Sequence, residues 1–243
     1  MSTRLPHLGV FPEQVSERVI VCGEPARVNR IAEFLDSPKL LGENREYRLM
    51  TGHYQGHRIT VCSTGIGAPS AVIALEELKP CGVRFIIRVG SAGALQASLN
   101  LGDLVVAEAA VRDEGASRAY VSPEFPACAS HRLVAGLRAM AEAGNYPVSY
   151  GVVRSHDGFY RDDEMAVCDY WSQKGVLAAD METAALYTVG RLRGIDVAAI
   201  LNTVVLYQQD VQEGVVDYAE SDKQMMAGEK KAIQFALAVV AQE

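Results

Sequence analysis

Short apolar runs and longer amphipathic segments alternate along the chain. Runs rich in valine and isoleucine predict buried strands, and segments with apolar residues every three or four positions predict helices. The expected strands are 19–22, a hairpin over 45–63 that turns at Gln55-Gly56, 84–89, 103–111, 150–154 and 197–205. The expected helices are 26–36, 70–78, 131–143, 181–193 and 222–241. This alternation is typical of a largely parallel sheet with helices on its faces, so we expect one α/β domain over residues 1–243, built in three layers.

Three of the expected strands run into glycine-bearing turns, and two of these regions carry an arginine. The segments are Val19–Arg27, Arg58–Gly67 and Phe85–Gly93. Glycine turns expose backbone N–H groups, and a helix that begins after such a turn presents the positive end of its dipole. One such turn is ordinary in an α/β fold. Three of them, together with Arg27 and Arg88, predict a site for an anion, most simply phosphate.

Composition limits the ligand that such a site can serve. Of the 243 residues 49% are hydrophobic and 22% charged, and the formal net charge of −7 argues against binding to nucleic acid or to an anionic membrane. The positive charge must then be local, which suits a small anionic ligand. The five cysteines are never spaced CxxC, no signal peptide is recognisable, and no apolar run approaches the roughly 18 residues of a membrane span. We therefore expect a cytoplasmic protein.

Eight short motifs follow one another along nearly the whole chain. They are His7-Leu-Gly, Gly23-Glu-Pro-Ala-Arg27, Asn44-Arg45-Glu-Tyr, Ser63-Thr-Gly-Ile-Gly-Ala-Pro-Ser70, Arg88-Val-Gly-Ser91-Ala-Gly93, Glu124-Phe-Pro, Phe159-Tyr160 and Asp180-Met181-Glu182. In this order and spacing they resemble the nucleoside phosphorylase family, which includes bacterial uridine phosphorylase and hexameric purine nucleoside phosphorylase. The resemblance implies a twisted mixed β-sheet and an assembly of dimers or of three dimers. It also implies that inorganic phosphate cleaves an N-glycosidic bond to give a free base and ribose 1-phosphate.

The phosphate side of the family's site matches this chain. The implied phosphate ligands are Gly23, Arg27, Arg45, Arg88 and Ser91, of which Arg45 enters from the neighbouring subunit. Arg88 lies on an otherwise apolar strand, where a charge without a bound anion is costly. For Arg45 the competing interpretation is an ordinary surface arginine beside Glu46.

The ribose side matches as well. The resemblance implies that His7 of the adjacent subunit, Met181 and Glu182 bind the sugar. A carboxylate at Glu182 can accept hydrogen bonds from both cis hydroxyls of ribose, and Met181 can pack against the ring. Arg88 and Glu182 are thereby the implied catalytic residues. The competing interpretation makes Asp180 and Glu182 ordinary acids at the start of a helix.

The base side departs from the family. Leu206 stands where the purine enzymes carry the aspartate that protonates the base, and Asp163 and Met165 stand where the uridine enzymes carry a glutamine and an arginine. The candidate base-binding residues are Ala92, Gly93, Phe159, Asp163 and Leu206. Among them Phe159 is expected to form a wall against the base, and Asp163 to read an edge rich in N–H donors. A solvated loop acid is the competing interpretation of Asp163.

The leading interpretation is a nucleoside phosphorylase that is closer to the uridine branch but has an atypical base pocket. A purine nucleoside phosphorylase and a noncatalytic nucleoside- or phosphate-binding relative remain as alternatives. A nicotinamide-dependent oxidoreductase is disfavoured, because Gly65-Ile-Gly67 lacks the third glycine of the G-x-G-x-x-G motif. The retained arginines disfavour a hydrolytic nucleosidase.

Phosphate is expected as a co-substrate, and no cofactor is expected. The histidines form no credible metal cluster in the sequence. The resemblance allows a monovalent cation near Glu46 and Ser70.

Overall fold

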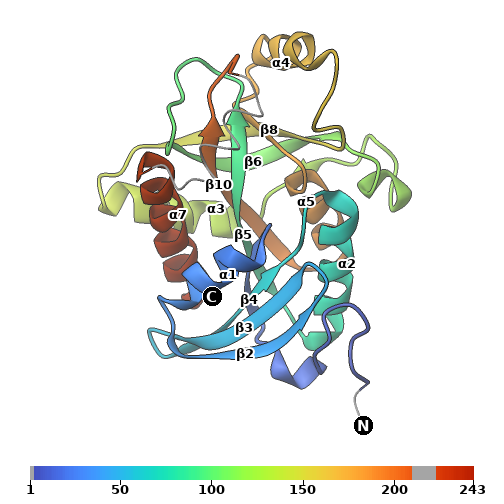
Figure 1. Cartoon of the computed structure of the whole chain (residues 1–243), viewed down its shortest axis with the longest axis vertical. Coiled ribbons are helices and arrows are strands. Elements are labelled where there is room, and N and C mark those ends of the chain that lie inside the picture. The colour runs from blue at the N-terminus through green and yellow to red at the C-terminus, as the bar shows by residue number, and fades with distance from the viewer. Residues whose placement is uncertain (1–2, 210–222) are drawn as a thin grey trace.

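A mixed β-sheet forms the centre of the protein (Figure 1). The computed structural model describes residues 3–209 and 223–243. The strands are β1 (Arg18–Cys22), β2 (Asp36–Asn44), β3 (Tyr47–Tyr54), β4 (His57–Ser63), β5 (Phe85–Ala94), β6 (Leu104–Asp113), β7 (Ala127–Cys128), β8 (Val148–His156), β9 (Ala178–Asp180) and β10 (Asp196–Val205). The helices are α1 (Pro25–Ala32), α2 (Ala68–Leu78), α3 (His131–Ala143), α4 (Glu164–Ser172), α5 (Thr183–Arg193) and α7 (Lys223–Ala241), with short 3-10 helices at Pro12–Gln14, Lys79–Cys81 and Ser117–Ala119.

The order of the strands makes the sheet close on itself. Neighbouring strands follow the order β10-β6-β8-β9-β5-β1-β4-β3-β2, and β10 also pairs with β5. Strands β5, β10, β6, β8 and β9 therefore form a closed, barrel-like ring, from which β1, β4, β3 and β2 extend. Strand β5 runs parallel to β1 and β10 and antiparallel to β9. The expected α/β fold with a mixed sheet is confirmed. The closure was not expected, because the hydrophobic pattern of a strand does not specify its partner.

Helices cover the sheet on both sides. In Figure 1, α7 and α3 lie on one side, and α2 and α5 on the other. Helix α7 packs on β10, β5 and β1, and α5 packs on β6 and β10. Residues 85–90 and 197–205 are accordingly buried without interruption, as in strands covered on both faces. None of the helices within 3–209 and 223–243 combines the length and the apolar character needed to cross a bilayer.

Several expected elements are confirmed. The hairpin that turns at Gln55-Gly56 is β3 and β4, and the helix expected over 131–143 is α3. Helix α5 begins at Thr183 and ends where Gly194 adopts the left-handed conformation, with φ of 66°. This geometry is typical of a glycine that terminates a helix.

Other elements differ from the expectation. The helix expected over 26–36 ends at Ala32, and β2 follows it. This strand contains Pro38 and Gly42, which disfavour a strand assignment, but β2 lies at the end of the strand order, where proline is tolerated. Helix α4 replaces part of an expected polar loop. None of its residues is fully buried, so it has no apolar stripe that would reveal it in the sequence.

Strand β5 is the difference that matters most for the site. The strand expected over 84–89 extends to Ala94, so Ser91 and Gly93 lie within a strand and not in a turn. The other two glycine turns do form. Gly23 precedes α1, and Gly67, with φ of 93°, precedes α2.

Candidate active site

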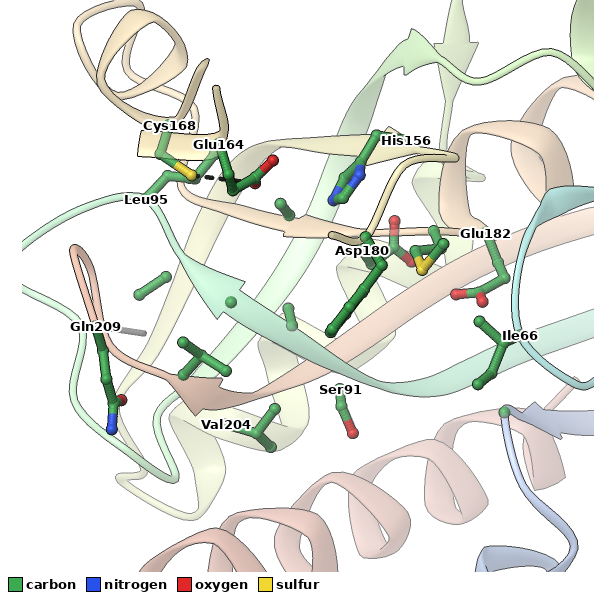
Figure 2. Close-up of a pocket in the computed structure, with 18 of the residues that line it drawn as sticks. Ile66, Ser91, Leu95, His156, Glu164, Cys168, Asp180, Glu182, Val204 and Gln209 are labelled. Carbon is green, nitrogen blue, oxygen red and sulfur yellow. Dashed lines mark hydrogen bonds between the residues drawn. The ribbon is translucent and has the colours of Figure 1, made fainter. Parts of the chain in front are cut away.

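A cavity of about 360 Å³ lies near the carboxyl ends of the parallel strands β1, β5 and β10 (Figure 2). Ligands of α/β folds commonly bind at this end of the strands. Most of the residues singled out from the sequence line it: Gly23, Arg27, Arg88, Ser91, Ala92, Gly93, Phe159, Met181, Glu182 and Leu206. Segments far apart in the sequence therefore meet in one place.

Arg27 is held by two elements besides its own helix, strand β5 and helix α7. It projects from the first turn of α1 and is only 4% exposed. Its Nη2 donates to the Ser91 hydroxyl over 2.7 Å, and its Nη1 donates to the Val89 carbonyl over 3.1 Å. Its Nε donates to Glu229 of α7 over 2.7 Å. These contacts hold a planar, charged donor against the cavity wall, which suits a phosphate oxygen.

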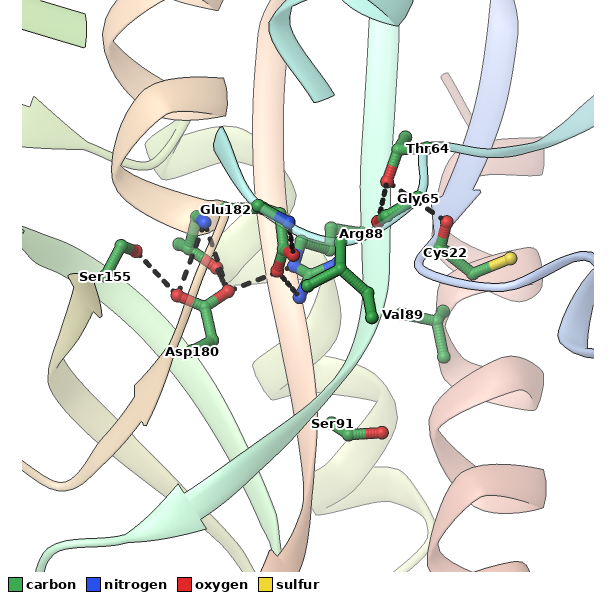
Figure 3. Close-up of polar contacts among 12 residues, drawn as sticks. Cys22, Thr64, Gly65, Arg88, Val89, Ser91, Ser155, Asp180 and Glu182 are labelled. Atoms are coloured by element: carbon green, nitrogen blue, oxygen red, sulfur yellow. Dashed lines mark hydrogen bonds and ion pairs between the residues drawn. The ribbon is translucent and has the colours of Figure 1, made fainter. Parts of the chain in front are cut away.

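Arg88 pairs with two buried carboxylates (Figure 3). Its Nε donates to Asp180 over 3.1 Å, and its Nη2 donates to Glu182. Although burial acts in the opposite direction, the two carboxylates raise the pKa of the Arg88 guanidinium, which therefore stays charged. Within the described part of the chain, its buried Nη1 has no hydrogen-bond partner. Leaving such a donor unpaired is costly, and Arg88 lines the cavity, where an anion would supply acceptors.

Gly90 makes room for this guanidinium. A Cβ atom at Gly90 would lie 2.9 Å from Cζ of Arg88 and 2.7 Å from Cδ2 of Leu201. Any side chain here would displace the arginine or the neighbouring strand β10. A glycine that the sequence pattern assigns to a turn thus serves close packing inside a strand.

Glu182 lies beside Arg88 at the N-cap position of α5. Its Oε1 accepts a hydrogen bond of 2.6 Å from the backbone N–H of Gly67, at the start of α2. Burial raises the pKa of Glu182, against the opposing effect of Arg88. With Met181, this carboxylate forms the wall next to the arginines. That arrangement fits the expected contacts with ribose hydroxyls.

Asp180 lines the cavity beside Glu182 and holds several neighbouring groups in place. Its carboxylate accepts hydrogen bonds from the Ser155 hydroxyl over 2.6 Å, and from the backbone N–H and hydroxyl of Thr183 over 3.1 and 2.6 Å (Figure 3). It therefore caps the first turn of α5 while it orients Arg88. The competing interpretation of an acid at a helix start thus applies to Asp180.

Two expected site residues lie away from this chain's own cavity. The Nδ1 atom of His7 is 2.6 Å from Oε1 of Glu77 on α2. Arg45 is exposed in the turn between β2 and β3, with φ of 56°. Both were expected to act in a neighbouring subunit, and this role stays a prediction.

Glu46 and Ser70 lie on either side of Gly65. A Cβ atom at Gly65 would come within 2.6 Å of Glu46 and 3.1 Å of Ser70. The two residues expected near a monovalent cation are therefore neighbours, and the cation itself stays a prediction. Residues 3–209 and 223–243 contain no group of three or more His, Cys, Asp or Glu side chains arranged to hold a metal ion.

The base end of the cavity differs from the expectation. Asp163 does not line the cavity, because its exposed carboxylate pairs with Arg161 over 2.8 Å. Its neighbour Glu164, the first residue of α4, lines the cavity instead, together with His156 at the end of β8. Neither was expected from the sequence. The sequence signal for His156 is that it follows the strand expected over 150–154, at the same end of the sheet as the other site residues, and nothing comparable marks Glu164.

Comparisons with known proteins identify the family of this chain. The chain matches the Phosphorylase superfamily over residues 17–241. A guanosine phosphorylase from Halorubrum lacusprofundi is 41% identical over 195 residues, which is 80% of each chain. The crystal structure of uridine phosphorylase from Vibrio fischeri ES114 has a TM-score of 0.93 at 55% identity, covering 99% of this chain and 98% of that chain. Purine nucleoside phosphorylase from Toxoplasma gondii has a TM-score of 0.91 at 30% identity, covering 100% and 96%. The chain belongs to the phosphorylase superfamily and is a nucleoside phosphorylase, a class of pentosyltransferase.

Proposed function

We propose that this enzyme cleaves a nucleoside with inorganic phosphate, with phosphate held by Arg27, Arg88, Ser91 and the backbone N–H of Gly23, and ribose held by Met181 and Glu182. A phosphate oxygen forms a bond to the anomeric carbon as the bond from that carbon to the base breaks. The base leaves with the electron pair and takes up a proton. Fixed cations beside the phosphate and a carboxylate on the ribose hydroxyls position the reactants and stabilise the charges that develop.

The observation that carries this proposal is the unpaired Nη1 of Arg88. The same guanidinium donates to Glu182 through its Nη2. One side chain therefore lies between the proposed phosphate ligands and the proposed ribose ligands. A phosphate ion offers several charged acceptors to Arg27, Arg88 and Ser91 at once, whereas one water molecule does not. This supports phosphorolysis over hydrolysis.

The test is release of ribose 1-phosphate from a panel of nucleosides, with and without phosphate. Arg88→Lys keeps a positive charge but loses the planar guanidinium, whose separate N–H groups contact both carboxylates and the anion. The value of kcat/KM for phosphate should therefore fall by roughly 10²–10³-fold. Arg88→Ala also leaves two buried carboxylates without a partner and is expected to destabilise the fold. Arg84→Lys, at an exposed arginine just before the same strand, is the matched control.

Two results would contradict the proposal. Base release that does not depend on phosphate would make the protein a hydrolase. Binding of nucleosides without any product would make it a noncatalytic relative.

The proposal extends to the assembly and its surroundings. A homo-oligomer, a dimer or three dimers, would let His7 and Arg45 reach a neighbouring site, and both lie outside the cavity of their own chain. A cytoplasmic location is supported by the five cysteines, all of which are free thiols. The adjacent Glu46 and Ser70 support a monovalent cation at Gly65.

A further inference from the structure

Glu164, a carboxylate with one unpaired oxygen, lines the end of the cavity beside α4. Glu164 is largely buried, with 17% of its side chain exposed. Its Oε1 accepts a hydrogen bond of 3.3 Å from the Cys168 thiol (Figure 2). Its Oε2 is buried and has no hydrogen-bond partner within 3–209 and 223–243. Buried carboxylate oxygens are almost always paired, and Nη1 and Nη2 of the neighbouring Arg154 also lack a hydrogen-bond partner within the described residues, so this end of the site has unused hydrogen-bonding capacity.

His156 presents a second acceptor at this end. Its Nδ1 is 2.9 Å from the Gly158 carbonyl, which can only accept, so Nδ1 carries the proton. Burial, helped by the nearby charge of Arg154, lowers the pKa of His156 and keeps the ring neutral at pH 7. Its Nε2 is then a lone-pair acceptor. Figure 2 shows His156 and Glu164 across the cavity from Ser91. Ser91 belongs to the phosphate corner, the part of the cavity lined by Gly23, Arg27, Arg88 and Ser91.

Arg154 offsets the cost of a negative charge at Glu164. It is completely buried and is held by Asp113, with Nε and Nη2 at 2.9 and 2.8 Å from the carboxylate. Its Nη1 lies 3.9 Å from Oε1 of Glu164. Arg154 does not itself line the cavity, so the ligand would meet the carboxylate and not the arginine.

The other polar groups nearby are partly occupied. Gln209 accepts from the backbone N–H of Leu206 over 2.9 Å, and the Gln208 amide donates to Asp169 over 3.3 Å. Among residues 3–209 and 223–243, the rest of this end is largely apolar, with Phe159 and Met165. Its ionisable groups, Glu164 and His156, are therefore both acceptors, while the amide N–H₂ of Gln209 remains as a donor.

We infer that Glu164 selects a base with two adjacent N–H donors, which among the common nucleobases means guanine. This inference rests on the proposed phosphorolysis. The two carboxylate oxygens match the ring N1–H and the 2-amino group of guanine. Uracil places its only N–H between two carbonyls, which a carboxylate repels. Adenine and cytosine place a bare ring nitrogen beside their amino group, and hypoxanthine has one donor in place of two.

The experiment compares guanosine, inosine and uridine with wild-type enzyme and Glu164→Gln. Guanosine and inosine differ only in the 2-amino group, so their ratio of kcat/KM isolates the contact made to it. The wild type should prefer guanosine to inosine by about tenfold or more. Glu164→Gln should lower kcat/KM for guanosine by roughly 10–100-fold and inosine by less, because an amide offers one acceptor in place of two.

Asp162→Asn is the matched control, since Asp162 is an exposed acid two residues away that does not line the cavity. Asp163→Asn tests the rival carboxylate. Binding of free guanine and hypoxanthine to the wild type adds a measurement that needs no variant, and guanine should bind more tightly.

The inference is overturned if the wild type prefers uridine, if Glu164→Gln leaves the guanosine-to-inosine ratio unchanged, or if Asp163→Asn changes that ratio instead. In each of these cases ribose 1-phosphate still forms, and the proposed phosphorolysis stands. Formation of no ribose 1-phosphate from any nucleoside would contradict the proposed function itself.

Discussion

Glu182 interacts with Arg88 and, in the proposed reaction, also with the ribose hydroxyls. It neutralises Arg88 in a buried site, and in the proposed reaction it must also accept hydrogen bonds from ribose hydroxyls. Only the ionised form can do both. Burial raises the pKa of Glu182, so its protonation on acidification begins at a higher pH than for an ordinary glutamate.

The raised pKa of Glu182 predicts the acid side of the pH profile. As pH falls toward this pKa, the ionised fraction of Glu182 decreases and kcat/KM for the nucleoside should fall with it. Glu182→Gln cannot titrate, so it should lose this limb and be slower at neutral pH by roughly 10–100-fold. The measurement is kcat/KM against pH at saturating phosphate for both proteins. Protonation of phosphate affects both alike, so an identical acid limb in Glu182→Gln would refute the assignment.

Elements differ in how clearly the sequence predicts them. Strands such as β10 are buried along almost their whole length, so a continuous apolar run in the sequence predicts them. Helix α5 is predicted by its apolar residues and by Gly194, which terminates it. Strand β2 and helix α4 lie at the periphery and bury little, so neither leaves a periodic pattern. This limit reaches the site, because α4 supplies Glu164.

The phosphate and ribose residues are more predictable than the base residues. Arg27 and Glu182 stand next to a glycine turn or a helix start, and Arg88 interrupts an apolar strand, so each gives a local signal that is visible in the sequence. Glu164 and His156 meet only because β8 joins the closed ring and α4 covers its end. Contacts of this kind depend on pairing between distant segments, which hydrophobic periodicity does not encode.

Helix α7 reaches the phosphate corner through one buried carboxylate. Glu229 is 2% exposed and bonds Arg27 over 2.7 Å and Nη2 of Arg30 over 3.0 Å. It touches no proposed substrate position, so it acts by positioning Arg27. Helix α7 is thereby tied to the proposed phosphate ligands Gly23, Arg27, Arg88 and Ser91, all of which lie in the first half of the chain.

Glu229→Gln should therefore weaken phosphate binding selectively. A neutral amide holds the Arg27 guanidinium less firmly than a carboxylate does, so KM for phosphate should rise by about tenfold while KM for the nucleoside changes little. Glu76→Gln, which breaks a partly exposed pair with Arg193, is the control and should have little effect. A fall in KM for phosphate would mean that the negative charge of Glu229, and not the orientation of Arg27, decides binding.

The balance of charge around the phosphate corner indicates that a second chain contributes to the site. Around the phosphate corner the arginines at 27, 30 and 88 face the carboxylates of Glu24, Asp180, Glu182 and Glu229. The corner therefore has no surplus positive charge, yet a phosphate dianion brings two negative charges. We therefore expect an additional cation at the occupied site, and we propose that the exposed Arg45 of a second chain supplies it.

Mixing two inactive variants tests this sharing. In a dimer of one Arg45→Ala chain and one Arg88→Lys chain, one site contains both lesions and the other contains neither. Random reassociation makes about half of the dimers mixed, so activity should recover to about a quarter of wild type. The measurement is ribose 1-phosphate release after the two proteins are dissociated together and allowed to reassemble.

Arg88→Lys mixed with Ser91→Ala is the control, because both residues line the cavity of their own chain. Every site in that mixture keeps one lesion, and no recovery is expected. If Arg45→Ala is fully active alone, or if its mixture with Arg88→Lys gains nothing over the parent proteins, each chain completes its own site. The extra positive charge would then have to come from within the same chain.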